Sequence, residues 1–144
     1  MKRVSITLLC LMATSILLVT GCRDDEETPD PIVGTWQKSK VEKSTNGGAW
    51  TTTTLACELD DTEEYSTNGQ WTLYSGPNQC NAGTGVVSGT WRLAANRTKI
   101  VYTYDGVPGE YESTVDHLSG SELVIIHAVG DVANTQYKTT YVKQ

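Results

Sequence analysis

Hydrophobic and polar residues alternate in short runs from residue 32 to the end of the chain, and the runs are rich in Val, Ile, Thr, Tyr and Trp. Alternation with a period of two is typical of β-strands, and no stretch shows the 3.6-residue period of an amphipathic helix. Gly, Asn and Pro separate the runs, as expected of turns. The pattern predicts nine strands, at residues 33–42, 49–56, 62–66, 70–75, 86–94, 99–104, 111–118, 122–129 and 135–143.

The connections between the predicted strands are nearly all 2–6 residues long, which is typical of an antiparallel meander. Asn46-Gly47 and Asn68-Gly69 accept the positive φ angles of tight hairpins. A flat sheet of this size would expose two edges and one apolar face, and closure removes both problems. We therefore expect an all-β fold, an antiparallel up-and-down meander closed into a β-barrel of eight to nine strands, in preference to a sandwich.

The first 21 residues have the pattern of a removable signal, with a basic start and a mostly apolar stretch up to Val19. The segment from Leu17 to Cys22 resembles the lipobox of bacterial lipoproteins. This resemblance implies that the Cys22 thiol is diacylated and that the chain is cut before it. Two or three acyl chains anchor a protein stably, whereas one does not. The alternative is an uncleaved anchor, because residues 4–22 are uncharged and just long enough to span a bilayer.

Residues 22–31 form an acidic tether that contains two prolines. The four carboxylates of residues 24–27 repel one another, and the prolines disfavour a helix. An acidic run beside a lipidated Cys also resembles the export signal of Bacteroidetes lipoproteins. We expect a lipid-anchored outer-membrane protein exposed at the cell surface, with a periplasm-facing position as the alternative. The domains are then a signal peptide at 1–21, a tether at 22–31 and a β-barrel at 32–144.

The balance of charge excludes one class of partner. The full chain has a formal net charge of −6, and removal of the signal with Lys2 and Arg3 leaves 9 basic against 17 acidic residues, a charge of −8. A nucleic-acid binder needs a basic face that displaces counterions. We expect no nucleic-acid partner.

Two of the four cysteines remain in the domain once Cys10 has left with the signal and Cys22 is lipidated. A remaining pair in an oxidising compartment favours a disulfide between Cys57 and Cys80. Antiparallel pairing around the Asn68-Gly69 hairpin would bring the two residues together. A metal site would need two further ligands and a catalytic thiol would need a base, and neither cysteine has a His near it in the sequence.

The chain shows no Ser-His-Asp arrangement, phosphate loop or zinc spacing, so we expect no catalysis, no cofactor and no metal. The acidic residues between 58 and 64 lack the spacing of a calcium loop, and we expect them to form a solvated loop and strand edge. Asp116 and His117 are adjacent on a strand and point to opposite faces, which weakens a catalytic dyad.

Alternation also places aromatic and aliphatic side chains together on single faces of the strands. Facing inward, they would form an apolar cavity with phenol and imidazole groups, suited to an amphipathic small molecule. Alternatively, they fill a narrow eight-stranded barrel completely. The candidates for the cavity are Trp71, Leu73, Trp91, Tyr102, Tyr104, His117, Ile125, His127 and Tyr137.

Three motifs resemble a known family. Gly34-Thr35-Trp36 resembles the Gly-x-Trp with which lipocalins begin. The stretch from Cys57 to Trp71 resembles the Cys, acidic-pair, aromatic and Asn-Gly pattern of the Bacteroidetes-type lipocalin-like domain found in bacterial lipoproteins, and Gly89-Thr90-Trp91 resembles its middle strand. The resemblance covers most of residues 32–144. It implies an eight-stranded lipocalin-like barrel with a cup-like cavity and with Gly34 and Trp36 at its base.

Lipocalins usually place an Arg late in the chain over the first-strand Trp. The late cations of this chain are Lys138 and Lys143, so a lysine would have to provide the cation–π contact.

The sequence therefore predicts a membrane-anchored lipocalin-like lipoprotein that binds a small apolar or amphipathic ligand without catalysis. The alternative is an interaction module with a packed barrel, in which exposed Trp50 and the threonines at 51–54 contact a partner protein or a glycan. A lined cavity would favour the first hypothesis, and a flat exposed aromatic patch the second.

Overall fold

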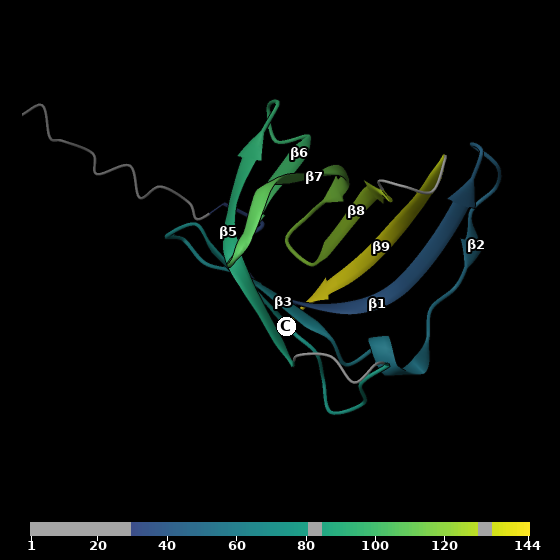
Figure 1. The fold of residues 1–144 in the computed structure, drawn as a ribbon, viewed down its shortest axis with the longest axis horizontal. Coiled ribbons are helices and arrows are strands. Elements are labelled where there is room, and N and C mark those ends of the chain that lie inside the picture. The colour runs from purple at the N-terminus through teal and green to yellow at the C-terminus, as the bar shows by residue number, and fades with distance from the viewer. Residues whose placement is uncertain (1–29, 81–84, 130–133) are drawn as a thin grey trace, which may run out of the picture.

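The computed structural model describes residues 30–80, 85–129 and 134–144, which form a single antiparallel sheet (Figure 1). The predicted signal peptide, Cys22 and nearly all of the tether lie outside these residues. The elements are β1 (Gly34–Thr45), β2 (Thr51–Thr52), the 3-10 turn η1 (Ala56–Glu58), β3 (Thr62–Tyr65), β4 (Gln70–Tyr74), β5 (Val86–Ala94), β6 (Lys99–Tyr104), β7 (Val107–Leu118), β8 (Glu122–Ala128) and β9 (Thr135–Lys143).

Eight of the strands form a closed barrel in the order β1-β3-β4-β5-β6-β7-β8-β9, and pairing of β9 with β1 closes the ring. Figure 1 shows these first and last strands side by side. Every pairing is antiparallel, and each strand from β3 onward pairs with the next in the chain. The predicted all-β meander closed into an eight-stranded barrel is confirmed. In the described part of the chain, no helix is long and apolar enough to cross a membrane.

The ninth strand, β2, is much shorter than the predicted strand at 49–56. It pairs with β1 only at Glu42 and Lys43. The Thr54 side chain explains its end, because Thr54 Oγ1 accepts a hydrogen bond from Val41 N at 2.7 Å and lies 3.2 Å from Val41 O. Thr53 N still donates to Val41 O at 2.8 Å, so the hydroxyl replaces only the backbone acceptor of Val41 N, and the strand ladder ends there. The chain then leaves β1 and turns through η1.

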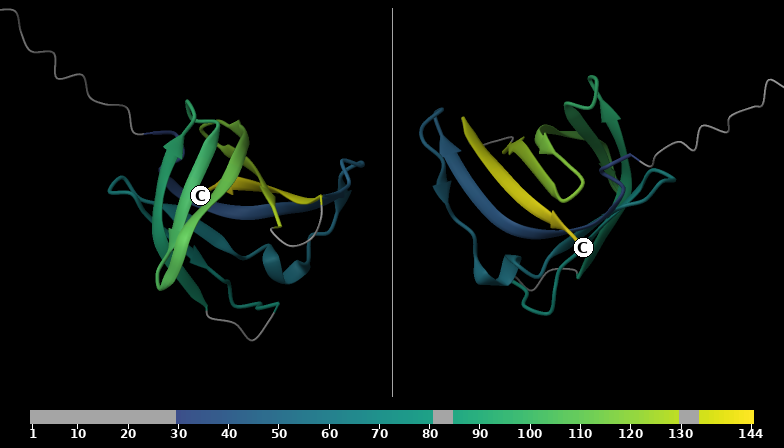
Figure 2. Two further views of the ribbon diagram at one scale, coloured as in Figure 1. Left: turned by 45° about the horizontal axis from the view of Figure 1, so that its top comes forward. Right: turned by 180° about the vertical axis from the view of Figure 1, so that it is seen from behind.

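The register of the strands defines two ends of the barrel. The closed end holds residues 30–36 and the turns at 66–69, 95–98 and 119–121, which follow from the pairs Gly34–Tyr65 and Trp36–Lys143. The open end holds η1, the connection that leaves β4, and the turn at 105–106. Figure 2 shows η1 beside residues 75–80, which follow β4 and to which the Cys57–Cys80 bond joins it.

The most deeply buried side chains gather at the closed end, where they fill the barrel. Trp36 is fully buried, and its Nε1 donates a hydrogen bond to Ile32 O at 2.6 Å, so the segment before β1 forms a plug. Complete burial of one such apolar side chain contributes roughly 1.5–3 kcal/mol. The fully buried residues are Trp36, Tyr65, Ile32, Ile100 and Leu123.

Candidate functional site

The interior toward the open end is hollow. An inner cavity of about 440 Å³ and a side cavity of about 480 Å³ have the size of small-molecule sites. His127 on β8 lines both. The side cavity is lined by Lys38, Val41, Thr53, Leu55, Glu58, His127, Val129, Tyr137 and Thr139. The inner cavity is lined by Glu63, Trp71, Tyr102, Tyr104, Glu110, Tyr111, Glu112, Ser113, Ile125, His127, Ala128 and Tyr141.

Glu63 is the buried polar centre of the inner cavity, and its side chain lies inside the barrel with only 7% of the residue exposed. Tyr65 Oη donates to Glu63 Oε2 at 2.6 Å, and Trp71 Nε1 donates to the same oxygen at 3.1 Å. Tyr141 Oη donates to Glu63 Oε1 at 2.5 Å. Tyr65 and Tyr102 hydroxyls are 2.9 Å apart. Since Tyr65 gives its one proton to Glu63, Tyr102 is the donor in that pair.

Burial keeps these hydroxyl groups protonated. It raises the pKa of Tyr65, Tyr102 and Tyr141 well above the ordinary value, and the negative charge of Glu63 raises all three further. At neutral pH the three phenols therefore act as hydrogen-bond donors, Tyr65 and Tyr141 to the Glu63 carboxylate and Tyr102 to Tyr65.

The inward position of Glu63 corrects the prediction that the acidic residues at 58–64 form a solvated loop and strand edge. Glu63 pairs with Trp36 on one side and with Leu73 on the other, and paired residues share a face of the sheet. Because side chains alternate along β3, Glu63 and Tyr65 point inward and Glu64 points outward. The signal in the sequence was this period-two relation between Glu63 and Tyr65.

His117 was a cavity candidate, and this prediction is wrong. Its side chain is 54% exposed, and its Nε2 lies 3.8 Å from Glu122 Oε1. The register shifts between Val115 and His117, and a β-bulge at this point reverses the alternation of faces. His117 therefore lies outside the wall, and His127 lies inside it.

The other predicted cavity residues are on the inner side of the barrel, but not all of them line a cavity. Leu73 and Trp91 pack against the buried core, and Trp91 Nε1 donates to Ser66 O at 3.1 Å near the closed end. Tyr137 lines the side cavity, where its ring stacks with His127 at 5.7 Å. The predicted residues that line the inner cavity are Trp71, Tyr102, Tyr104, Ile125 and His127.

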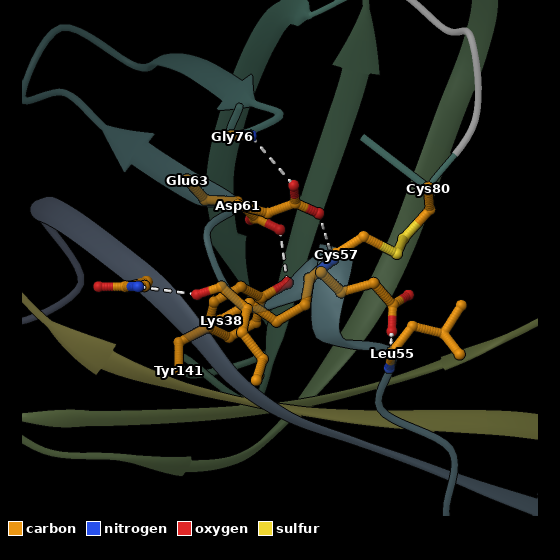
Figure 3. Close-up of polar contacts among 11 residues, drawn as sticks. Lys38, Leu55, Cys57, Asp61, Glu63, Gly76, Cys80 and Tyr141 are labelled. Carbon is orange, nitrogen blue, oxygen red and sulfur yellow. Dashed lines mark hydrogen bonds and ion pairs between the residues drawn. A yellow bond between two sulfur atoms is a disulfide. The ribbon is translucent and has the colours of Figure 1, made fainter. Parts of the chain in front are cut away.

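A disulfide and acidic side chains hold the loops of the open end in place (Figure 3). Cys57 and Cys80 form the predicted bond, with their Cα atoms 5.2 Å apart. Asp61 Oδ2 pairs with Lys38 Nζ at 2.9 Å, and Asp61 Oδ1 accepts a hydrogen bond from Gly76 N at 3.3 Å. Asp60 Oδ2 accepts two from Asn78, at 2.9 and 3.0 Å. These carboxylates thus bind protein groups, and the described residues contain no group of three or more potential metal ligands.

At the closed end, Lys143 Nζ lies 5.0 Å from the centre of the Trp36 ring and donates to Pro31 O at 3.0 Å. Lysine therefore stands where lipocalins usually have arginine. Gly34 has a φ of +135°, and a Cβ atom there would lie 2.7 Å from Lys143 Cε. The positive φ and the close lysine together explain why glycine occupies this position.

Trp50, the centre of the alternative hypothesis, is half-buried on the outside of the barrel. Lys138 Nζ lies 4.7 Å from the centre of its ring. Thr51 and Thr52 beside it are exposed.

A family model and one solved structure agree with this architecture. A comparison with curated proteins found no match. A crystallised lipocalin-like protein from Bacteroides uniformis ATCC 8492 is similar in fold, with a TM-score of 0.51 and 17% identity over 80% of this chain and 100% of that chain. A redesigned β-barrel matches with a TM-score of 0.37 and 14% identity over 79% of this chain and 92% of that chain. The lipocalin-like domain family model matches residues 32–125, and with this match the chain belongs to the lipocalin-like domain family.

Proposed function

We propose that this protein is a membrane-anchored, non-catalytic binding protein for a small amphipathic molecule. The observation that carries the proposal is the inner cavity, about 440 Å³ of space inside a barrel whose fully buried side chains gather at the other end. A hollow, mostly apolar interior with a few convergent polar groups is the usual form of a small-molecule site.

The chemistry of the lining supports an amphipathic rather than a purely apolar ligand. Trp71, Tyr104 and Ile125 offer apolar surface, while Glu63 and Ser113 offer polar groups at the same wall. A ligand that left such buried groups without partners would lose about 1–3 kcal/mol for each of them. A molecule with both an apolar and a polar part satisfies the whole lining.

The state of the phenols supports binding without catalysis. Their raised pKa values keep Tyr65, Tyr102 and Tyr141 protonated, and Tyr65 and Tyr141 already donate to Glu63. General acid–base catalysis works best with a pKa near the operating pH. These hydroxyl groups therefore hold the Glu63 side chain in place and are not suited to exchange protons with a ligand.

Ligand binding in the inner cavity can be tested with a substitution that fills the cavity. Ser113 is buried and lines the inner cavity, whereas Thr114 next to it is exposed on the outside. Mature protein should release a bound small molecule on solvent extraction, detected by mass spectrometry. Ser113→Phe should abolish binding of this molecule, and the matched control Thr114→Phe should retain it. Equal recovery from both variants, or none from the native protein, would contradict the proposal.

The anchor is proposed from the sequence alone, since Cys22 lies outside the described residues. We infer that acyl chains on Cys22 hold the barrel at the outer membrane and that the acidic tether presents it at the cell surface. Cys22→Ser should remove the acyl mass and release the protein from the membrane fraction. Protease added to intact cells should digest the native protein if it faces outward and spare it if it faces the periplasm.

Contact with a partner protein or glycan through Trp50 is the less supported alternative. Lys138 already covers one face of the Trp50 ring, and the barrel has a hollow interior in place of a packed one. Trp50→Ala should therefore leave the extracted ligand unchanged.

A further inference from the structure

The charge of the ligand can be inferred from the inner cavity, on the assumption that the proposed function is correct. Glu63 brings a buried carboxylate to the cavity wall, and its three hydrogen-bond donors, Tyr65, Trp71 and Tyr141, are all neutral. A carboxylate has about four acceptor sites. Three donors leave Glu63 room for one more.

Positive charge is scarce around Glu63. The described residues that line the inner cavity include three glutamates and neither Lys nor Arg. Lys99 and Arg92 neutralise Glu112 and Glu110, with N–O distances of 2.5 and 3.0 Å. Among the described residues, Glu63 forms no ion pair within 4.0 Å.

The remaining nearby bases do not supply the missing charge. Lys38 Nζ is paired with Asp61 at 2.9 Å, at the open end. Burial lowers the pKa of His127, and Lys38 lowers it further, against the opposing effect of Glu63, so its imidazole is neutral at pH 7. A buried carboxylate without a cation is costly, and a bound cation would offset this cost.

The aromatic wall favours the same ligand charge. Trp71 and Tyr104 are in edge-to-face contact at 5.3 Å, and Tyr104 and Tyr111 at 4.9 Å, so the rings form a continuous row along the cavity. The negative faces of aromatic rings attract ammonium groups, most strongly where water is excluded. Carboxylate and rings together form a site for a cation with an apolar tail.

We propose that the inner cavity binds an amphipathic amine, with its ammonium group against Glu63 and the ring of Trp71 and its apolar part along Tyr104 and Tyr111. The ligand class is thus an organic cation rather than a fatty acid or a neutral lipid.

Three probes with the same ten-carbon tail test the charge. Decylammonium, decanol and decanoate are titrated into the mature protein at pH 7, below their micelle concentrations, and followed by tryptophan fluorescence and calorimetry. Decylammonium should bind at least about tenfold more tightly than decanol, and decanoate should bind most weakly. Ser113→Phe should lose decylammonium binding, because the filled cavity leaves no room for it.

A matched pair of variants tests the role of Glu63. Glu63→Gln keeps the shape and removes the charge, and it should abolish the preference for decylammonium while decanol affinity stays within about twofold. Glu64→Gln makes the same charge change on the outer face of β3 and should keep the native preference. If Glu63→Gln fails to fold, the order of affinity of the three probes for the native protein tests the inferred charge of the ligand.

The outcomes separate the two proposals. If none of the probes binds, the proposed function fails, and the amine inference fails with it. If decanol or decanoate binds as tightly as decylammonium, the cavity is a binding site but the inferred charge is wrong. If Ser113→Phe still binds decylammonium, the amine is held by the acidic surface and the inference is also wrong.

Discussion

At the closed end of the barrel the side chains fill the interior, whereas at the open end they only line it. The closed end holds the fully buried Trp36, Ile32 and Tyr65, with Lys143 over the Trp36 ring. The open end holds two cavities, and its loops are held by the Cys57–Cys80 bond and by the ion pair of Lys38 and Asp61.

The difference shows how one small barrel is both stable and hollow. Apolar packing stabilises a fold in proportion to the area removed from water, so a cavity at one end leaves that end with less of this stabilisation. A disulfide stabilises mainly by restricting the unfolded chain and needs no filled interior. The open end therefore relies on cross-links, and the closed end relies on packing.

Loss of the Trp36 side chain at the closed end should have the largest effect on stability. Trp36→Ala removes a fully buried ring and its hydrogen bond to Ile32, and it should lower the free energy of unfolding by about 3–5 kcal/mol. Urea titration measures this loss. Trp50→Ala, at the half-buried outer tryptophan, should cost about 1 kcal/mol or less. Equal losses in the two variants would show that the closed end is not the packed part of the barrel.

Removal of the disulfide should come next. The bond closes a loop with a sequence separation of 23, so Cys57→Ser with Cys80→Ser should lower the free energy of unfolding by about 3–4 kcal/mol. Reductant should lower the stability of the native protein to that of the variant and leave the variant unchanged. If the double variant matches the oxidised protein in urea, cross-linking does not hold the open end.

A single methyl group at the closed end should have a smaller effect. Gly34→Ala places a Cβ beside Lys143 at a φ of +135° and should cost about 1–3 kcal/mol. Gly120→Ala adds the same methyl group at a turn of the same end, where nothing lies within 4 Å of it. The difference between the two unfolding curves isolates the strain at Gly34, and identical curves would contradict it.

Protonation of His127 at the open end should have the smallest effect on stability. Burial lowers the pKa of His127 in the folded protein, while in the unfolded chain it titrates near its ordinary value of 6.5. Below 6.5 the unfolded chain therefore binds a proton that the folded protein does not, so stability falls as the pH decreases toward the folded-state pKa. His127→Gln should remove this part of the slope between pH 7.5 and 5.5 in urea titrations. The idea fails if His127→Gln keeps the native slope over this range.

Much of the wall was predictable, because alternation and turn residues act locally. The predicted strands at 86–94, 99–104 and 135–143 coincide with β5, β6 and β9, and the prediction for β8 was one residue too long. The start of β7 was missed, since Val107 pairs with Tyr104 past a register shift and residues such as Pro108 and Gly109 do not indicate a strand. The short β2 was missed because the acceptor of Val41 N is the Thr54 hydroxyl and not a backbone carbonyl.

The sequence by itself determined the class of the fold, the cysteine pair and most of the inner faces, because each depends on a local period or on a count of residues. Only the tertiary structure decided that Glu63 lies inside, that His117 lies outside, and that one end is filled while the other is hollow. These features depend on register, bulges and the closure of β1 against β9, whose paired residues lie about a hundred positions apart. Packing of the whole barrel sets contacts at such separation. It also sets the one-residue bulges that move a side chain to the other face of the sheet, and neither leaves a local pattern in the chain.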